Sequence, residues 1–286
     1  MGETGKSAIL AKHIFGGYAV KETKWLIVAA AVIVLGAGTA IYVKWQGQKP
    51  AEQPLVEAPQ APPAPPQASV EPAIRHPIEE APAAQPLPAL GESDPAMRKS
   101  LAELIGKSRF ARFFYPDRII RRIVATIDNL PRKTVAINLM PVKAVAGSFI
   151  VEETQDDTVI GAKNAARYGA YVKLMQAVDA HKLVAFYVSF YPLFQQDYVE
   201  LGYPKGYFND RLIEAIDNML DAPDLKSPIL LVQPKVMYEF ADPDLEARSA
   251  GQKIIMRMGS ENAAKVKAKL REIRSEVMLR APKQSK

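Results

Sequence analysis

Apolar residues recur at helical spacing along most of the C-terminal two thirds of this chain, and these stripes predict helices. The stripes cover residues 95–106, 116–130, 168–178, 183–201 and 206–220, with a last helix from about residue 260. Pro192 lies inside one of them and should kink or interrupt that helix. Asp94 and Asp242 each precede a proline, a pair typical of a helix start.

Short runs of a different kind predict strands. Residues 134–140 alternate apolar and polar positions, and residues 149–151 follow a Gly-Ser turn signal. Residues 228–232 and 236–240 are two more short apolar runs between turn-forming residues. Together with the helical stripes, these runs predict a mainly α fold with a small antiparallel β element, an α+β domain.

One long apolar run without charges precedes this domain, and Trp25 and Trp45 flank it. About 18 apolar residues in a helix cover about 27 Å, which is close to the thickness of a bilayer core, and indole rings favour the membrane–water interface. We therefore expect residues 25–45 to cross the lipid bilayer with both tryptophans as interface anchors. A cleaved signal peptide is the alternative, but the run and the segment before it are both long for one.

The charges beside this run predict its orientation. Four lysines precede it within residues 1–24, whereas Lys44 and Lys49 follow it closely. The positive-inside rule then places the N-terminus in the cytoplasm and the C-terminal domain outside, in the periplasm of a Gram-negative cell. The expected location is the bacterial inner membrane. Gly36 and Ala40 form a small-xxx-small pair that could support a homodimer.

Composition divides the chain into five parts. We expect a cytoplasmic tail (1–24), the membrane helix (25–45), a disordered Pro/Ala-rich linker (46–92), a globular exported domain (93–280) and a short tail (281–286). The linker has too few apolar residues to offset its ordering entropy, and its prolines extend it. The chain has no cysteine, which excludes disulfides and a lipidated N-terminal cysteine.

Few residues of the domain suit catalysis. His181 is its one histidine, so multi-histidine metal sites are excluded, and we expect no metal and no cofactor. No motif for a Ser-His-Asp enzyme is present. The remaining alternative is a hydrolase or lyase acting on peptidoglycan or a related glycan through paired carboxylates, with Asp210 and Glu214 as the candidate pair. The separation and burial of the pair decide that alternative, and a sequence gives neither.

Binding residues are easier to nominate, because arginines cluster near residue 120 and aromatic residues are dense over 187–208. The candidates for contact with a partner or ligand are Arg118, Arg121, Arg122, Tyr191, Tyr203, Tyr207, Asn209 and Arg211. The aromatic residues could equally form a core with polar tips, and Asp210 could belong to a structural network with an arginine. A net charge of +6 is compatible with nucleic-acid binding. An exported domain does not meet nucleic acid, however, so we expect no nucleic-acid partner.

Three strings carry a resemblance to a known family: RRIVATIDNLPRK (121–133), FYPLFQQDYVELGYPKGYFNDRLIEAID (190–217) and VQPKVMYEFADPDLEARSAGQKIIMRMG (232–259). In these strings the chain resembles the bacterial domain-of-unknown-function family 3014 from about residue 93 to residue 274. The resemblance implies an N-terminal anchor and a Pro-rich spacer, and it implies no activity. We therefore expect an interaction or scaffold module of the cell envelope, whose partner is an envelope protein or peptidoglycan.

Overall fold

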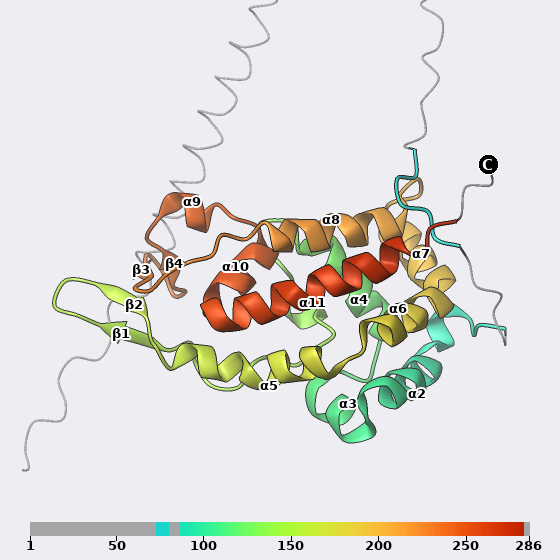
Figure 1. Cartoon of the computed structure of the whole chain (residues 1–286), viewed down its shortest axis with the longest axis horizontal. Helices are drawn as coiled ribbons and strands as arrows, with labels where there is room; N and C mark the ends of the chain where they lie inside the picture. Colours follow the sequence, from blue (N-terminus) through green and yellow to red (C-terminus); the bar gives the residue numbers. More distant parts are fainter. Residues whose placement is uncertain (1–72, 80–85, 283–286) are drawn as a thin grey trace, which may run out of the picture. The chain divides into compact units, whose positions relative to one another are not determined.

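The computed structural model describes residues 73–79 and 86–282, and the fold within them is mainly helical with a small antiparallel sheet (Figure 1). The helices are α2 (Asp94–Ile105), α3 (Lys107–Phe113), α4 (Ile119–Asn129), α5 (Asn164–Ala177), α6 (Ala180–Ser189), α7 (Tyr191–Glu200), α8 (Phe208–Leu220), α9 (Pro243–Glu246), α10 (Ala250–Arg257) and α11 (Ser260–Met278). The α+β prediction is thus confirmed for these residues. No helix among them is both long and apolar enough to cross a bilayer. The predicted span over 25–45 lies outside the described residues.

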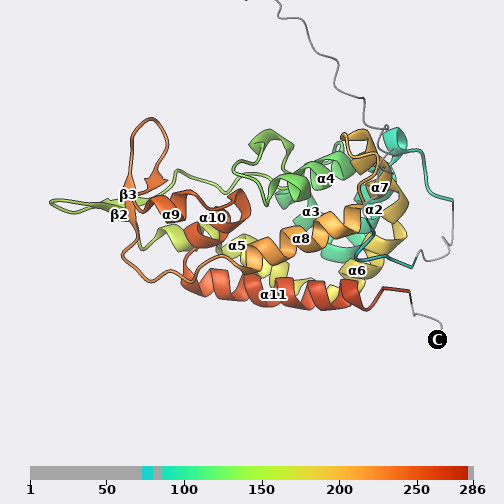
Figure 2. The same cartoon turned by 90° about the horizontal axis from the view of Figure 1, so that it is seen from above.

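Helix α11 packs against α5, α6 and α8 (Figures 1 and 2). Its predicted apolar stripe is buried at Val266, Leu270 and Val277. Lys267, which the periodicity places outside this stripe, is also buried, at 5% exposure. Its ammonium group donates hydrogen bonds to the Ala222 carbonyl and to the Asp224 carboxylate, which offset the cost of burying the charge.

The aromatic-rich stretch forms the centre of the main core. Tyr191, Phe194 and Phe208 are each at most 1% exposed, and the rings of Phe194 and Phe208 stack with their centroids 5.9 Å apart. Pro192 interrupts the predicted helix 183–201, because α6 ends at Ser189 and α7 begins with the proline in its first turn. Rings from α6, α7 and α8 meet in this one cluster.

The sheet has the strand order β1 (Val151–Glu153), β2 (Thr158–Ile160), β3 (Leu230–Val232) and β4 (Glu239–Phe240), and every neighbouring pair is antiparallel. In both views it lies at the end of the domain away from α2 and α7 (Figures 1 and 2). The predictions at 149–151, 228–232 and 236–240 identify three of the strands, with shorter or shifted bounds.

The predicted strand over 134–140 is wrong. Residues Ile137–Leu139 form a 3₁₀ helix, and Ile137 is 71% exposed. The guanidinium group of Arg122 donates to the carbonyl oxygens of Asn138 and Met140 at 2.7 and 3.1 Å. A side chain therefore satisfies backbone groups that a strand would pair with a neighbouring strand.

Part of the predicted disordered linker 46–92 lies on the domain, so that prediction needs a correction. Residues 73–79, drawn in cyan in Figure 1, form hydrogen bonds with α8, and Ile78 is 6% exposed within the main core cluster. Residues Leu90–Glu92 form a 3₁₀ turn, η1, before α2. We call residues 73–79 the linker strap. A single aliphatic side chain and exposed backbone groups were enough to dock a segment whose composition indicates disorder.

Candidate functional site

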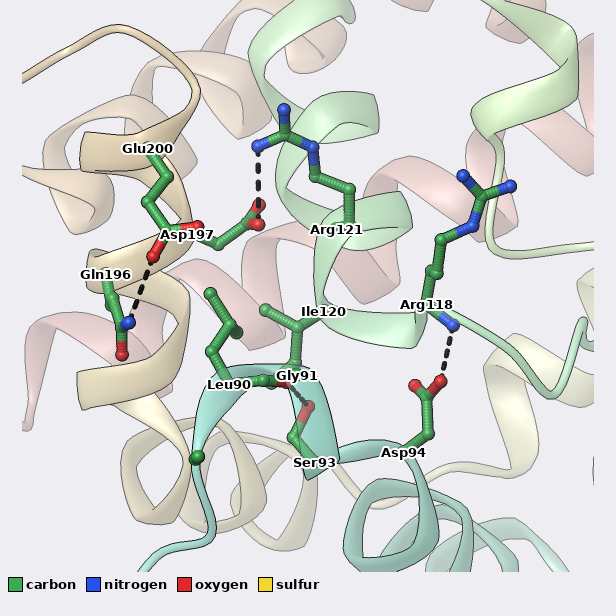
Figure 3. Close-up of a pocket in the computed structure, with 11 residues that line it drawn as sticks. Leu90, Gly91, Ser93, Asp94, Arg118, Ile120, Arg121, Gln196, Asp197 and Glu200 are labelled. Atoms are coloured by element: carbon green, nitrogen blue, oxygen red, sulfur yellow. Dashed lines mark hydrogen bonds and ion pairs between the residues drawn. The ribbon is translucent and has the colours of Figure 1, made fainter.

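A pocket of about 410 Å³ opens between η1, the start of α4 and the face of α7 (Figure 3). Basic, acidic and apolar side chains all line it. The lining residues are Ala89, Leu90, Gly91, Ser93, Asp94, Arg118, Ile120, Arg121, Gln196, Asp197 and Glu200. The pocket contains two of the predicted binding residues, Arg118 and Arg121, and its size suits a small polar group.

Asp94 fixes the start of α4 beside the pocket. Its carboxylate oxygens accept hydrogen bonds from the backbone N–H groups of Arg118 and Ile119, at 2.7 and 2.9 Å. Asp94 is the first residue of α2, yet it satisfies N–H groups at the start of another helix, where a negative charge is also favourable. Arg118 has a left-handed backbone with φ of 52°, which is uncommon for a residue with a side chain. The site is therefore built partly from a strained residue held by a long-range cap.

Asp197 is the most unusual group in the pocket. It projects from α7 toward Arg121, whose Nη1 donates to its Oδ1 at 3.3 Å (Figure 3). The Asp197 side chain is 5% exposed, and its Oδ2 is buried with no hydrogen-bond partner among the described residues. Burial raises the pKa of the Asp197 carboxyl group, and the positive charge of Arg121 opposes this rise. Burying an acceptor without a donor costs free energy, so Asp197 Oδ2 needs a hydrogen-bond donor that the described residues do not supply.

The cationic side of the pocket has spare hydrogen-bonding capacity. Arg121 is 39% exposed at its side chain, and its one hydrogen bond to a described residue is the bond to Asp197. The Arg118 guanidinium forms no ion pair or hydrogen bond with the described residues. Glu200 accepts a hydrogen bond from Gln196 at 3.0 Å, which holds it at the rim. Arg121 thus faces Asp197 with several donors uncommitted, a pattern suited to an acceptor group on a ligand, whereas the Arg118 guanidinium is directed away from Asp197 (Figure 3).

The third candidate arginine serves the fold. Arg122 donates to the carbonyl of Asp117 at 3.0 Å, as well as to the 138–140 turn, and its guanidinium lies 4.6 Å from the centre of the Tyr115 ring. It lies outside the lining of the pocket. Sequence periodicity places all three arginines on the polar side of α4, but it does not distinguish the two that line the pocket from the one that holds a turn.

Tyr203 and Arg211 belong to a buried network around Asp128. The Tyr203 hydroxyl donates to one Asp128 oxygen at 3.2 Å, and Arg211 Nε donates to the other at 3.1 Å. Arg132 also bonds the Asp128 carboxylate, at 3.0 Å. Asp128 is 4% exposed and the Arg211 side chain 13%. These predicted binding residues therefore form part of a structural network, and Tyr191, at 1% exposure, lies in the core.

Tyr207, Asn209 and Asp210 hold the linker strap. Both oxygens of Asp210 accept backbone N–H groups of the strap, so Asp210 is neither paired with an arginine nor free to act on a substrate in this structure. Glu214, its candidate catalytic partner, is 48% exposed and pairs with Arg211 at 2.8 Å. His181 lies on the surface, with its side chain 67% exposed.

Reasoning from the sequence overlooked Gln196 and the role of Asp94 in this site. It also did not single out Asp197, although a signal of its burial was present. Asp197 lies three residues after Phe194, on the same side of α7 as the core. A charged residue on the apolar face of a helix is rarely buried without a specific partner.

Comparison with known protein families gave one match, to the family described as "Protein of unknown function (DUF3014)", over residues 119–274. This match covers more than half of the 286 residues. The chain belongs to the DUF3014 family. The DUF3014 match contains α4 and α7, and with them Arg121 and Asp197, whereas η1 and Asp94 precede it. No curated protein and no solved structure matched the chain.

Proposed function

We propose that this DUF3014 protein is a single-pass protein of the bacterial inner membrane whose periplasmic domain binds another envelope component, a protein or peptidoglycan. The charge-free run between Trp25 and Trp45 and the lysines before it support the anchor and its orientation. The Pro-rich segment after the run supports a tethered domain. A C-terminal alkaline phosphatase fusion should be active, and an inactive fusion would overturn the topology.

The single observation that carries the binding role is the pocket between η1, α4 and α7. It brings a buried acceptor without a donor among the described residues, Asp197 Oδ2, next to the uncommitted donors of Arg121, and Arg118 also contributes to the lining. Recognition sites have few polar groups in fixed positions within a partly apolar surface, and Leu90 and Ile120 supply that surface here. The expected ligand group both accepts hydrogen bonds from the guanidinium groups and donates one to the carboxylate.

The experiment is in vivo photo-crosslinking from the pocket rim. A photoreactive amino acid replaces Gln196 in the full-length tagged chain, and crosslinked species are identified by mass spectrometry. We expect a specific species that Arg118→Gln and Arg121→Gln each reduce by about tenfold, because the loss of one charged hydrogen bond is worth about 1.5–3 kcal/mol. Arg109→Gln is the matched control, since Arg109 is exposed on α3 outside this pocket.

Two results would contradict the proposal. If the photoreactive residue at position 196 gives no crosslinked species beyond the irradiated wild-type background, the pocket has no binding role. Equal yields from Arg121→Gln and Arg109→Gln would show that the captured component does not need the guanidinium groups. In either case, a version truncated after residue 90 separates capture by the domain from capture by the N-terminal part.

A further inference from the structure

The linker strap lies on the N-terminal end of α8 in the way a bound peptide would. The backbone N–H of Arg75 donates to Asp210 Oδ2 at 3.0 Å, and the backbone N–H of His76 donates to Oδ1 of the same carboxylate at 2.7 Å. One carboxylate thus binds two successive amides. Charge-assisted hydrogen bonds of this kind are stronger than neutral ones, and they impose a defined backbone direction on the bound segment.

Two further groups near the start of α8 also bind the strap backbone, and the Glu79 N–H of the strap donates to the Arg280 carbonyl at 3.0 Å. Asn209 Nδ2 donates to the His76 carbonyl at 2.8 Å, and the Tyr207 hydroxyl accepts the Ile78 N–H at 2.9 Å. Asn209 is 1% exposed, and its Oδ1 accepts the hydroxyl of Tyr187, which fixes the amide. Without the strap, the buried Asn209 amide would lose the acceptor that it now has. The site is therefore rigid and requires an occupant.

Ile78 is the one side chain of the strap that is buried, at 6% exposure. Arg75, Pro77 and Glu79 are exposed, and none of their side chains forms a hydrogen bond or ion pair with the described residues. Recognition therefore depends on the backbone, on one aliphatic anchor and on the half-buried His76 ring, whose Nδ1 is buried without a hydrogen-bond partner among the described residues. A site of this kind reads the shape of an extended segment more than its sequence.

We propose that the end of α8 formed by Tyr207, Asn209 and Asp210 is a peptide-binding site, and that the strap is its resident ligand. The ligand class is an extended segment with two consecutive backbone N–H groups followed, two residues on, by an aliphatic residue. A segment of that chemistry on another polypeptide can replace the strap. This site is separate from the pocket lined by Arg121 and Asp197, so each proposal can fail without the other.

Competition with the strap defines how the site is tested. A ligand tethered close to its site has an effective concentration in the millimolar range, so a free peptide competes poorly with the intact strap. Ile78→Asp removes the aliphatic anchor and should leave the site vacant. The probe is a fluorescent peptide with the sequence of residues 72–80, and its binding to the full-length chain in detergent micelles is followed by anisotropy.

We expect the Ile78→Asp chain to bind this peptide saturably and at least tenfold more tightly than the wild-type chain. Adding Asp210→Asn to Ile78→Asp should weaken binding about tenfold or more, because the two strap amides lose their charged acceptor. Asp244→Asn is the matched control for that change, since Asp244 is an exposed acid on α9, outside the pocket that Asp210 lines together with Arg75 and His76. A peptide with aspartate at its Ile78 position should not bind.

The proposal is overturned if the folded Ile78→Asp chain does not bind the peptide, or if Asp210→Asn and Asp244→Asn leave the same affinity. Ile78→Ala is the second variant, for the case that the aspartate disturbs the core, and circular dichroism reports the helical content of each. A measurement independent of those variants is hydrogen exchange in a chain that carries Asp210→Asn alone. This substitution should accelerate the exchange of the backbone amides of residues 75 and 76. Unchanged exchange there also overturns the proposal.

Discussion

Asp128→Asn should destabilise the domain far more than Asp217→Asn, although both substitutions remove an aspartate bound by arginine. The Asp128 side chain is 6% exposed and bonds Arg132, Tyr203 and Arg211. The Asp217 side chain is 43% exposed and bonds Arg274 alone, at 2.6 and 3.1 Å. The two changes are chemically identical, so the difference between them isolates the effect of burial.

The expected magnitudes follow from these exposures. Breaking a buried ion pair by removing one partner costs about 3–5 kcal/mol, because the other charge stays buried. The Arg211 side chain is 13% exposed but keeps its ion pair with Glu214 at 2.8 Å, so we expect the lower end, about 3 kcal/mol. The exposed pair of Asp217 is worth about 0–1 kcal/mol, because water screens it.

The assay is urea unfolding of the full-length chain, followed by circular dichroism at neutral pH. With an m-value of about 2 kcal/mol/M, Asp128→Asn should lower the unfolding midpoint by about 1.5 M, and Asp217→Asn by less than about 0.5 M. The m-values should agree, so that the midpoints compare stability alone. Equal shifts for the two variants would refute the view that burial makes this network structural, and would reopen Arg211 as a surface binding residue.

Two further outcomes are expected. A Cβ at Gly251 would lie 3.1 Å from the Leu130 carbonyl oxygen, so Gly251→Ala should lower the free energy of unfolding by about 1–3 kcal/mol. Gly169 in α5 has open space around it, so Gly169→Ala should raise the free energy of unfolding by about 0.5–1 kcal/mol. Calorimetry measures both changes. Since burial raises the pKa of Asp197, the native state holds its proton more tightly, and this group lowers stability as pH rises from about 3.9 through the raised pKa. Asp197→Asn should therefore gain in urea midpoint relative to wild type across that range, and a relative loss would show that Arg121 dominates.

Local patterns were sufficient for much of the fold. The stripes of α4, α8 and α11 depend on residues three and four apart, and they are buried as predicted. Asp242 caps α9 through the N–H groups of Asp244 and Leu245, as the Asp-Pro pair indicated. At the start of α10, the Gly251 N–H bonds the Leu130 carbonyl, and Ser249 and Gln252 form a capping box, whose spacing is a local pattern.

What the sequence did not predict depends on partners distant in the chain. Strand β2 lies in a polar stretch, and its pairing with β3 spans about 70 residues, which no local pattern reports. Asp94 satisfies N–H groups 24 and 25 residues away, and Asp210 binds amides more than 130 residues before it. The sequence indicated that Arg118 and Arg121 were available for binding, but only the fold shows that Asp197 lies beside them.

The linker strap also has a mechanical consequence. Residues 73–79 precede η1 in the chain, and η1 supplies one wall of the pocket beside Asp197. Any tension along the chain from its N-terminal side must first load the hydrogen bonds at Asp210 and the buried Ile78, before it reaches Leu90. The strap contacts thus carry pulling forces that would otherwise act on η1. While it stays docked, movement of the chain before residue 73 is not transmitted to the pocket wall.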